Sequence, residues 1–223
     1  IGAIEVAEGL PHPQLDGQWA KANPTASFAY MIMGFGEKDV EKALKVTKKA
    51  GFRYLYHPGP FETWGHFKLN PKQFPNGVKG MKKCVDKAKE YGIHLGAHTL
   101  SNFITPNDPY VTPTPDPRLA QVGTSVLAED ISKTQKEIPI ESPDFFNQFK
   151  NNHLKTVVVG SELVRYGSVS EQAPWRLLDC TRGAFDTKAA AHKKGDSIAK
   201  LADHAYRVFL TNPELTIEMS RNI

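Results

Sequence analysis

The sequence predicts an α/β fold, namely part of a TIM-type (β/α) barrel with an inserted β-rich subdomain after its third strand. The first observation is a strand–helix–strand–helix–strand order in which Gly51 and Gly92 each end a helix directly before the next apolar run. Such tight connections indicate parallel strands joined by right-handed crossovers. The second observation is Gly34-Phe35-Gly36, which lacks the third glycine of a dinucleotide-binding loop and therefore favours the barrel over a nucleotide-binding sheet.

The individual strands and helices follow from hydrophobic periodicity. Apolar runs at 27–35, 52–57 and 93–100 are short enough to be buried strands. Within 40–50, apolar residues recur every three or four positions, which predicts an amphipathic helix, and the pattern returns within 78–88. The junctions KKAGFRYLYH and KEYGIHLGAH align without gaps, so the sequence repeats one structural unit.

The second half of the chain does not continue the strand–helix repeat. Five prolines within 106–117 predict a rigid, extended linker. Helical spacing within 198–209 predicts a helix, and Asn212-Pro213 predicts the cap and first position of another. Short β-prone runs, which predict a β module between these segments, lie at 154–159, 162–166 and 175–180.

These patterns predict four segments along the chain. They are an irregular N-terminal segment 1–26, a first part of the barrel 27–105, an inserted β-rich module 106–190, and a return to barrel helices at 191–223. A closed barrel takes about 250 residues. Because the chain opens without methionine and ends within a predicted helix, we expect it to be a piece of a longer protein.

Composition excludes several classes of protein. The 223 residues carry a formal net charge of +4, which is far from the one-sided charge of a nucleic-acid binder. No apolar run approaches the roughly 18 residues that suggest a membrane helix. The two cysteines, Cys84 and Cys180, lie far apart in the sequence, so we expect two separate buried thiols rather than a disulfide or a redox pair.

Two histidines occupy equivalent positions in the repeat. His57 lies six residues after Gly51, and His98 lies six residues after Gly92. Both therefore fall at the carboxyl ends of neighbouring parallel strands, where α/β folds build their sites. Imidazole there can bond to hydroxyls or act as a base. The alternative is a pair of partly buried histidines that bond to the backbone.

The loops at the same edge add aromatic, amide and carboxylate groups. Trp64 suits stacking on a sugar ring, although it could equally form a hydrophobic loop core. The candidate catalytic residues are His57, His98 and Glu62, and the predicted carbohydrate-binding residues are Tyr56, His57, Trp64, His66, His98 and Asn102. His57, His66 and His98 could meet around a metal, but their spacing is not diagnostic, so the sequence predicts no metal site and no cofactor.

The phrase Phe74-Pro75-Asn76-Gly77, followed by a predicted helix and then Gly92-Ile93-His94-Leu95-Gly96, resembles the TIM-barrel glycoside hydrolases related to the α-galactosidases. The resemblance covers about 27–102 and 197–223. It implies a bacterial polysaccharide-degrading enzyme that acts through two carboxylates. In that group the carboxylates follow the fourth and later strands, so we expect them to lie beyond this chain, which alone would then be inactive.

A second resemblance concerns the β module. The segments 159–166 and 180–195 resemble a small module of bacterial and phage proteins with a pattern near IGDExxxY…TRGxxGTxxxxH, except that Asp186 replaces a glycine. We interpret Glu162, Arg182 and His192 as structural residues that hold strands and turns together.

The sequence therefore predicts a glycoside hydrolase that acts on a poly- or oligosaccharide. Two alternatives stay open: a polysaccharide lyase that uses His or Tyr, and a non-catalytic carbohydrate-binding protein. The expected partner is a carbohydrate, with no nucleic acid and no membrane span, and the expected location is periplasmic or secreted. The oligomeric state, the glycan and its linkage do not follow from the sequence.

Overall fold

The computed structural model describes residues 2–15, 17–23 and 29–223. They divide into two compact units, of which the first comprises 1–60 and 69–98 and the second comprises 61–68 and 99–223. The loop 61–68 thus belongs with the second unit, although the strand before it belongs to the first. This division separates the predicted site residues: Tyr56, His57 and His98 lie in the first unit, and Glu62, Trp64, His66 and Asn102 lie in the second.

The N-terminal segment contains short elements rather than wholly irregular chain. These are helix α1 (Gly2–Ala7), strands β1 (Gln14–Leu15) and β2 (Gln18–Trp19), which form an antiparallel hairpin, and the 3-10 helix η1 (Ala20–Ala22). The indole N–H of Trp19 donates to the Glu5 carboxylate at 2.9 Å, which ties the hairpin to α1. Residues 1, 16 and 24–26 of the predicted segment, and 27–28 of the first predicted strand, lie outside the described residues.

The first unit contains the predicted strand–helix repeat. Strands β3 (Tyr30–Ile32), β4 (Tyr54–His57) and β5 (His94–Ala97) pair in parallel, in that order. Helices α2 (Val40–Lys49) and α3 (Gly77–Glu90) are the crossovers between them. Gly51 and Gly92 follow the two helices with φ of +80° and +69°, which confirms the predicted left-handed ends.

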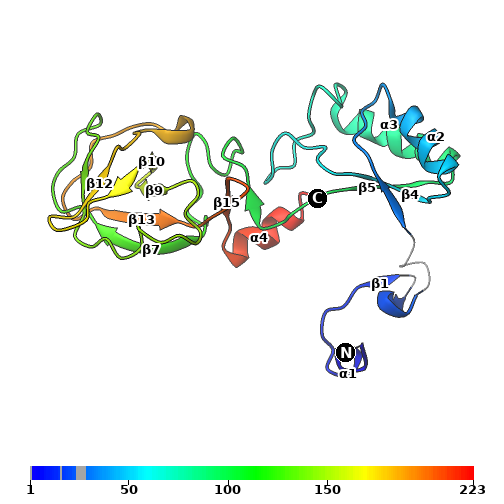
Figure 1. Cartoon of the computed structure of the whole chain (residues 1–223), viewed down its shortest axis with the longest axis horizontal. Helices are drawn as coiled ribbons and strands as arrows, with labels where there is room; N and C mark the ends of the chain where they lie inside the picture. The colour runs from blue at the N-terminus through cyan, green and yellow to red at the C-terminus, as the bar shows by residue number, and fades with distance from the viewer. Residues whose placement is uncertain (1, 16, 24–28) are drawn as a thin grey trace. The chain divides into compact units, whose positions relative to one another are not determined.

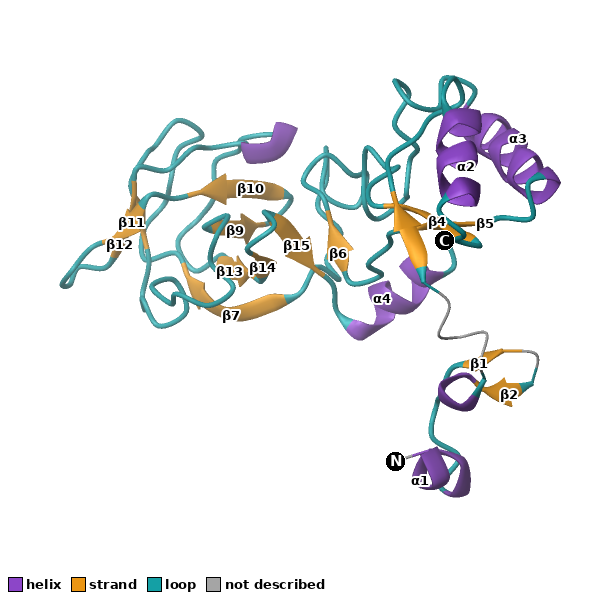
Figure 2. Ribbon diagram, turned by 45° about the vertical axis from the view of Figure 1, so that its right-hand side comes forward, coloured by secondary structure: helices purple, strands orange, loops and turns teal. Residues whose placement is uncertain are grey.

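Only one face of this sheet is covered by helices. Leu55 of β4 packs with Leu44 of α2 and with Cys84 and Ala88 of α3 in one buried cluster, and Figure 2 shows both helices on the same side of the strands. Because side chains alternate along a strand, Tyr54 and Tyr56 point to the opposite face. Parallel sheets usually bury both faces, so this exposed face is unusual.

The second unit is built of antiparallel β-structure (Figure 1). Its main sheet has the strand order β10 (Glu162–Arg165), β9 (Thr156–Val159), β13 (Ser197–Leu201), β7 (Gln121–Val126). A second sheet has the order β11 (Ser168–Val169), β12 (Arg176–Leu178), β8 (Ile138–Pro139). A third has the order β14 (Asp203–His204), β15 (Val208–Leu210), β6 (Phe103–Ile104). A 3-10 helix, η3 (Ala184–Asp186), and the final helix α4 (Pro213–Ser220) complete the unit.

The predicted fold class is wrong. Across the described residues the chain is mostly β, with four α-helices and several small sheets, none of which resembles a barrel. The repeat in the first unit misled the prediction because a strand–helix–strand order fixes the local handedness of a crossover and not the number of strands that follow. The β-rich part is the larger unit of the chain and not a small subdomain inserted in a barrel.

Two local predictions in the second half also fail. The predicted helix within 198–209 is instead the strands β13, β14 and β15. Almost every residue of β13 is buried, so it shows no alternation, and a short buried run cannot be assigned to helix or strand by its periodicity. The proline-rich 106–117 is not an extended linker, because Tyr110 and Val111 are buried in the hydrophobic cluster of the second unit.

Other local predictions are confirmed. The three β-prone runs contain β9, β10 and β12. Helix α4 begins with Pro213, and the side chain of Asn212 accepts the Leu215 N–H at 2.8 Å as its cap. Cys84 and Cys180 are both free and buried. Among the described helices, none has the length and apolar character required to cross a membrane.

Candidate functional site

The side chain of His57 is buried in the first unit and bonds to the backbone through both ring nitrogens. It is only 2% exposed. Nδ1 accepts the Gly59 N–H at 3.0 Å, so the proton of the neutral ring lies on Nε2, which donates to the Phe35 carbonyl at 3.0 Å. Burial lowers the pKa of His57, against the opposing effect of that bond. Both ring nitrogens are therefore used within the fold, and the geometry favours the alternative of a buried histidine for this position.

His98 forms a polar pair with Tyr56 at the carboxyl edge of the sheet. The Tyr56 hydroxyl lies 2.6 Å from Nδ1 of His98, within hydrogen-bond distance. Burial, and then the neighbouring Tyr30, raise the pKa of Tyr56, so this hydroxyl keeps its proton at neutral pH. The pair lies on the sheet face that the helices leave uncovered, beside a stacked Tyr54–His94 pair with ring centroids 5.2 Å apart. A cavity of about 660 Å³ on this face is lined in part by Tyr30, Tyr54, Tyr56 and His94.

Four neighbouring aromatic rings lie in the second unit, and Phe103 also contacts Tyr206, with ring centroids 6.1 Å apart. Trp64 and Phe103 have ring centroids 6.1 Å apart, Phe103 and His204 4.7 Å, and His204 and Tyr206 4.6 Å. We call these four residues the aromatic strip. They come from three segments: the loop 61–68, strand β6, and the hairpin formed by β14 and β15. The Tyr206 side chain is 66% exposed, and the other three are partly buried.

Only one member of the aromatic strip, Trp64, follows from sequence reasoning. Phe103 was missed, and so were His204 and Tyr206, the last two because 198–209 reads as a helix, whereas β14 and β15 form a tight antiparallel hairpin. Its turn contains Arg207 with φ of +57°, a conformation that a helix does not contain. Sequence periodicity gives no signal that separates the two structures, because 198–203 is buried without a break and such a run reads alike in a helix and in a central strand.

His66 forms a dyad with Asp108. The Asp108 carboxylate is fully buried and accepts the Nδ1–H of His66 at 2.8 Å, together with the backbone N–H groups of His66 at 2.8 Å and Tyr110 at 3.1 Å. Gly65 allows this approach, because a Cβ there would lie 2.5 Å from the carboxylate. The His66 ring stacks on Tyr110 with centroids 4.3 Å apart.

This dyad orients the imidazole of His66. Because an ionised carboxylate only accepts hydrogen bonds, Nδ1 carries the proton of the neutral ring and Nε2 has a free lone pair. The side chain of His66 is 44% exposed, so Nε2 is available to solvent or a ligand. The same arrangement orients catalytic and metal-binding histidines in other proteins.

The two remaining predicted site residues are exposed. The carboxylate of Glu62 lies 2.8 Å from Nζ of Lys68 in an ion pair on its own loop. Asn102 immediately precedes Phe103 of the aromatic strip and is exposed. Within the described parts of the chain, no three His, Cys, Asp or Glu side chains gather in a way that would hold a metal ion.

The β module contains a buried charge cluster that joins Glu162, Arg182 and His192. Glu162 is fully buried and accepts Nε and Nη2 of Arg182 at 2.9 and 2.7 Å and Nε2 of His192 at 2.8 Å. It also accepts the backbone N–H groups of Gly183 and Ala190 at 2.9 and 3.1 Å. The geometry agrees with the interpretation of these residues as structural, because every contact ties strand β10 to the segment 182–192.

No protein-family model matches this chain, and no curated protein matches it. The functional inference therefore depends on the geometry of these residues.

Proposed function

We propose that the chain binds carbohydrate on the aromatic strip of Trp64, Phe103, His204 and Tyr206. The observation that supports this function is the series of neighbouring rings, which ends at a Tyr206 side chain that is 66% exposed. Aromatic rings carry a negative face that attracts polarised C–H groups, and one face of a sugar ring presents such groups. Rings that lie this close together offer a sugar residue more than one aromatic contact.

Polar side chains near the aromatic strip can form hydrogen bonds with the hydroxyl groups of a sugar. His66 lies two positions from Trp64 on the same loop, and its exposed Nε2 accepts a hydrogen bond. Asn102 adds an amide beside Phe103, and the imidazole of His204 belongs to the strip itself. Binding sites usually combine a mainly apolar surface with a few placed polar groups of this kind.

Binding is supported better than hydrolysis. A glycoside hydrolase uses two carboxylates that flank the scissile bond. On the loop 61–68 the acidic residue is Glu62, and its carboxylate is held by Lys68 at 2.8 Å. Asp108 is buried behind His66 and cannot reach a ligand.

Tyr206→Ala tests this proposal. We expect a loss of affinity for the bound glycan of about fivefold, because one exposed stacking contact is worth about 1 kcal/mol. The melting temperature should stay nearly constant, since the side chain is mostly exposed. Affinity is measured by isothermal titration calorimetry with oligosaccharides of galactose, mannose, xylose and galacturonate.

Two control variants accompany this test. Tyr206→Phe keeps the ring and should retain binding, and Ile217→Ala removes another largely exposed apolar side chain, from helix α4, and should leave binding unchanged. Wild-type protein that binds none of these sugars, or Tyr206→Ala protein that binds as tightly as wild type, would contradict the proposal.

The His66–Asp108 dyad favours a second candidate function, elimination on an acidic polysaccharide. In this reaction Nε2 of His66 takes the C5 proton of a uronate, the C5–H electron pair forms the C4=C5 double bond, and the C4–O bond breaks. The leaving oxygen takes a proton from water. Asp108 is a positioning residue that holds the neutral ring in the Nδ1–H tautomer and stabilises the imidazolium that forms.

This second function predicts unsaturated uronate products from polygalacturonate or alginate, detected by their ultraviolet absorbance. His66→Gln should lower the rate about 100-fold or more, the usual contribution of a general base. Asp108→Asn should lower kcat and shift the pH profile while KM changes little. Absence of product with both polymers, or full activity of His66→Gln, would exclude elimination while leaving carbohydrate binding intact.

A further inference from the structure

The loop that carries Trp64 and His66 presents both an aromatic ring and an exposed imidazole, so its backbone decides how these two groups face a ligand. The Trp64 N–H donates to the Thr105 hydroxyl at 3.1 Å, and the Trp64 carbonyl accepts the Thr105 N–H at 3.1 Å. The His66 N–H donates to the Asp108 carboxylate at 2.8 Å. The residue between them, Gly65, is held from a different part of the second unit.

Asn222, which follows helix α4, bonds to Gly65 and also supports the ring on which His66 stacks. Nδ2 of Asn222 donates to the Gly65 carbonyl at 3.0 Å, across 157 positions of sequence, and to the Tyr110 hydroxyl at 3.3 Å. Because an asparagine nitrogen carries two hydrogens, it can make both bonds at once. The rings of Tyr110 and His66 have centroids 4.3 Å apart. One side chain therefore fixes both the peptide before His66 and the ring packed against its imidazole.

Both bonding partners of Asn222 require a donor. The Tyr110 hydroxyl gives its own proton to the Glu218 carboxylate at 2.8 Å, and the other Glu218 oxygen accepts Nη1 of Arg118 at 2.5 Å. Burial, and then the bond to Glu218, raise the pKa of Tyr110 against the opposing effect of Asn222, so this hydroxyl keeps its proton at neutral pH. The Tyr110 oxygen is therefore an acceptor toward Asn222, as is the Gly65 carbonyl. An amide nitrogen satisfies both acceptors, whereas a carboxylate oxygen satisfies neither.

The backbone at Gly65 makes this part of the loop dependent on its contacts. Gly65 has a φ of +127°, a conformation that residues with a side chain rarely adopt, and a Cβ there would lie 2.5 Å from the Asp108 carboxylate. The position is therefore restricted to glycine, which loses more conformational freedom on ordering than any other residue. A hydrogen bond from outside the loop offsets part of this cost.

We propose that Asn222 is a positioning residue for the carbohydrate site, which holds Trp64 and His66 in the orientation that a glycan contacts. It acts through the Gly65 peptide and the Tyr110 ring. The identity of the ligand rests on the proposed function, whereas the effect of Asn222 on His66 depends only on contacts within the second unit.

Asn222→Asp tests this role, because it keeps the size of the side chain and replaces the donating nitrogen with an oxygen. Without the two bonds, the Nδ1–H of His66 should no longer be fixed against Asp108. In ¹⁵N-labelled chain at alkaline pH, we therefore expect the ring nitrogens of His66 to give the signals of two exchanging tautomers. Wild type should give those of the Nδ1–H tautomer alone, because Asp108 accepts that proton.

The same variant should bind glycan less tightly. We expect affinity for the oligosaccharides to fall about fivefold, the loss that follows when the binding orientation is populated about one-fifth of the time. Isothermal titration calorimetry measures this loss. The melting temperature should stay nearly constant, because Asn222 is exposed and its substitute can turn to solvent.

Two control variants separate positioning from a general effect of substitution near helix α4. Asn222→Gln keeps the donating nitrogen and should retain the single tautomer and most of the affinity. Ile223→Ala removes the neighbouring side chain, which is 61% exposed, and should follow wild type in both measurements. Wild-type signals and affinity in Asn222→Asp would overturn the inference. A large fall in melting temperature in both Asn222 variants would also overturn it, since Asn222 would then act through the stability of the second unit.

Failure of this inference is distinguishable from failure of the proposed function. If Tyr206→Ala weakens glycan binding but Asn222→Asp changes neither tautomer nor affinity, the aromatic strip binds glycan and Asn222 does not position His66. If wild type binds none of the sugars, or Tyr206→Ala binds as tightly as wild type, the proposed function fails. Exchanging tautomers of His66 in Asn222→Asp would then still show that Asn222 positions this imidazole.

Discussion

Glu162→Gln should destabilise the second unit by roughly 3–5 kcal/mol, the usual cost of removing one partner from a buried ion pair. Arg182 would keep its charge with a side chain only 6% exposed and without a carboxylate. The amide of the new glutamine would also place a donor where the wild-type oxygens accept five donated hydrogen bonds. Denaturant unfolding measures this loss as a lower transition midpoint.

Two further variants test whether the loss of stability comes from the buried ion pair of Glu162 and Arg182 or from any Glu-to-Gln substitution. Glu129→Gln breaks the exposed pair with Arg176, whose atoms lie 3.5 Å apart, and should cost about 0–1 kcal/mol. Adding Arg182→Met to Glu162→Gln removes the unpaired charge and should recover part of the lost stability. A double variant that is less stable than Glu162→Gln alone would show that Arg182 stabilises the module without its carboxylate.

The cluster of Glu162, Arg182 and His192 also makes the second unit less stable at acid pH. Burial opposes ionisation of Glu162, but the bonds from Arg182, His192 and the two backbone N–H groups outweigh it and hold the pKa below its ordinary 4.5. The contribution to stability is therefore complete above about pH 4.5 and is lost as the pH falls through the pKa of the folded state. We expect a weaker acid dependence in Glu162→Gln.

Lys200→Met should change the alkaline dependence of stability. Lys200 is fully buried at the centre of the main sheet, where Nζ donates to the carbonyls of Leu201 and, at 3.2 Å, Asn151, and lies 3.7 Å from the Asp203 carboxylate. Burial lowers the pKa of Lys200 from 10.5 to about 8, against the opposing effect of Asp203. The folded state therefore releases this proton at a lower pH than the unfolded chain does.

The sign of the effect follows from proton counting. Between about pH 8 and 10.5 the unfolded chain binds the lysine proton and the folded chain does not, so stability contributed by this group rises with pH. The gap corresponds to about 3 kcal/mol, at about 1.4 kcal/mol for each pH unit. The difference in unfolding free energy between wild type and Lys200→Met should therefore increase by about 3 kcal/mol from pH 7 to pH 11.

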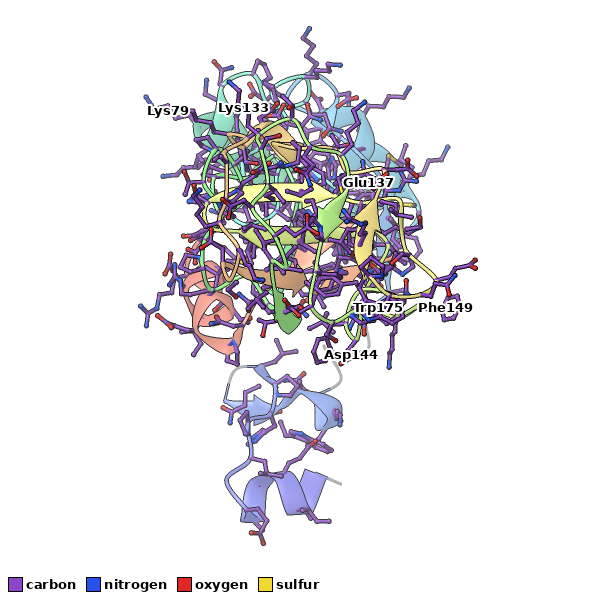
Figure 3. All side chains as sticks on the ribbon, turned by 90° about the vertical axis from the view of Figure 1, so that its left-hand side faces the viewer. Lys79, Lys133, Glu137, Asp144, Phe149 and Trp175 are labelled. Atoms are coloured by element: carbon purple, nitrogen blue, oxygen red, sulfur yellow. The ribbon has the colours of Figure 1, made fainter. Side chains whose placement is uncertain are left out.

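The test uses the difference in unfolding free energy between wild type and Lys200→Met, because other groups also titrate at alkaline pH. Burial raises the pKa of Cys180 to about 12 and raises that of Tyr166 as well, so both reduce stability at high pH in wild type and variant alike. Lys133→Met, on the surface of the same module (Figure 3), is the matched control and should follow wild type. If the unfolding free energies of wild type and Lys200→Met change with pH in parallel, the lowered pKa of Lys200 is contradicted.

Sequence reasoning located part of the candidate site. It found Trp64 from its loop, and His66 from the same loop, but not the Asp108 that orients His66. Asp108 lies 42 positions away in a proline-rich segment that reads as a linker, and only folding brings its carboxylate to 2.8 Å from the ring. His57 shows a different outcome: its position in the repeat allowed a site residue or a buried histidine, and in the structure both ring nitrogens bond to the backbone, which favours the second.

The sequence predicts the structure that depends on neighbouring residues, but it does not predict how distant segments pack together. Helices α2 and α3, their glycine ends and the cap of α4 follow from side-chain periodicity and backbone preference, which act within a few residues. The fold class, the hairpin that carries His204 and Tyr206, and the Glu162–Arg182–His192 cluster depend on contacts between distant segments. Burial decides those contacts, and an unbroken buried run such as 198–203 has the same pattern in a helix and in a central strand.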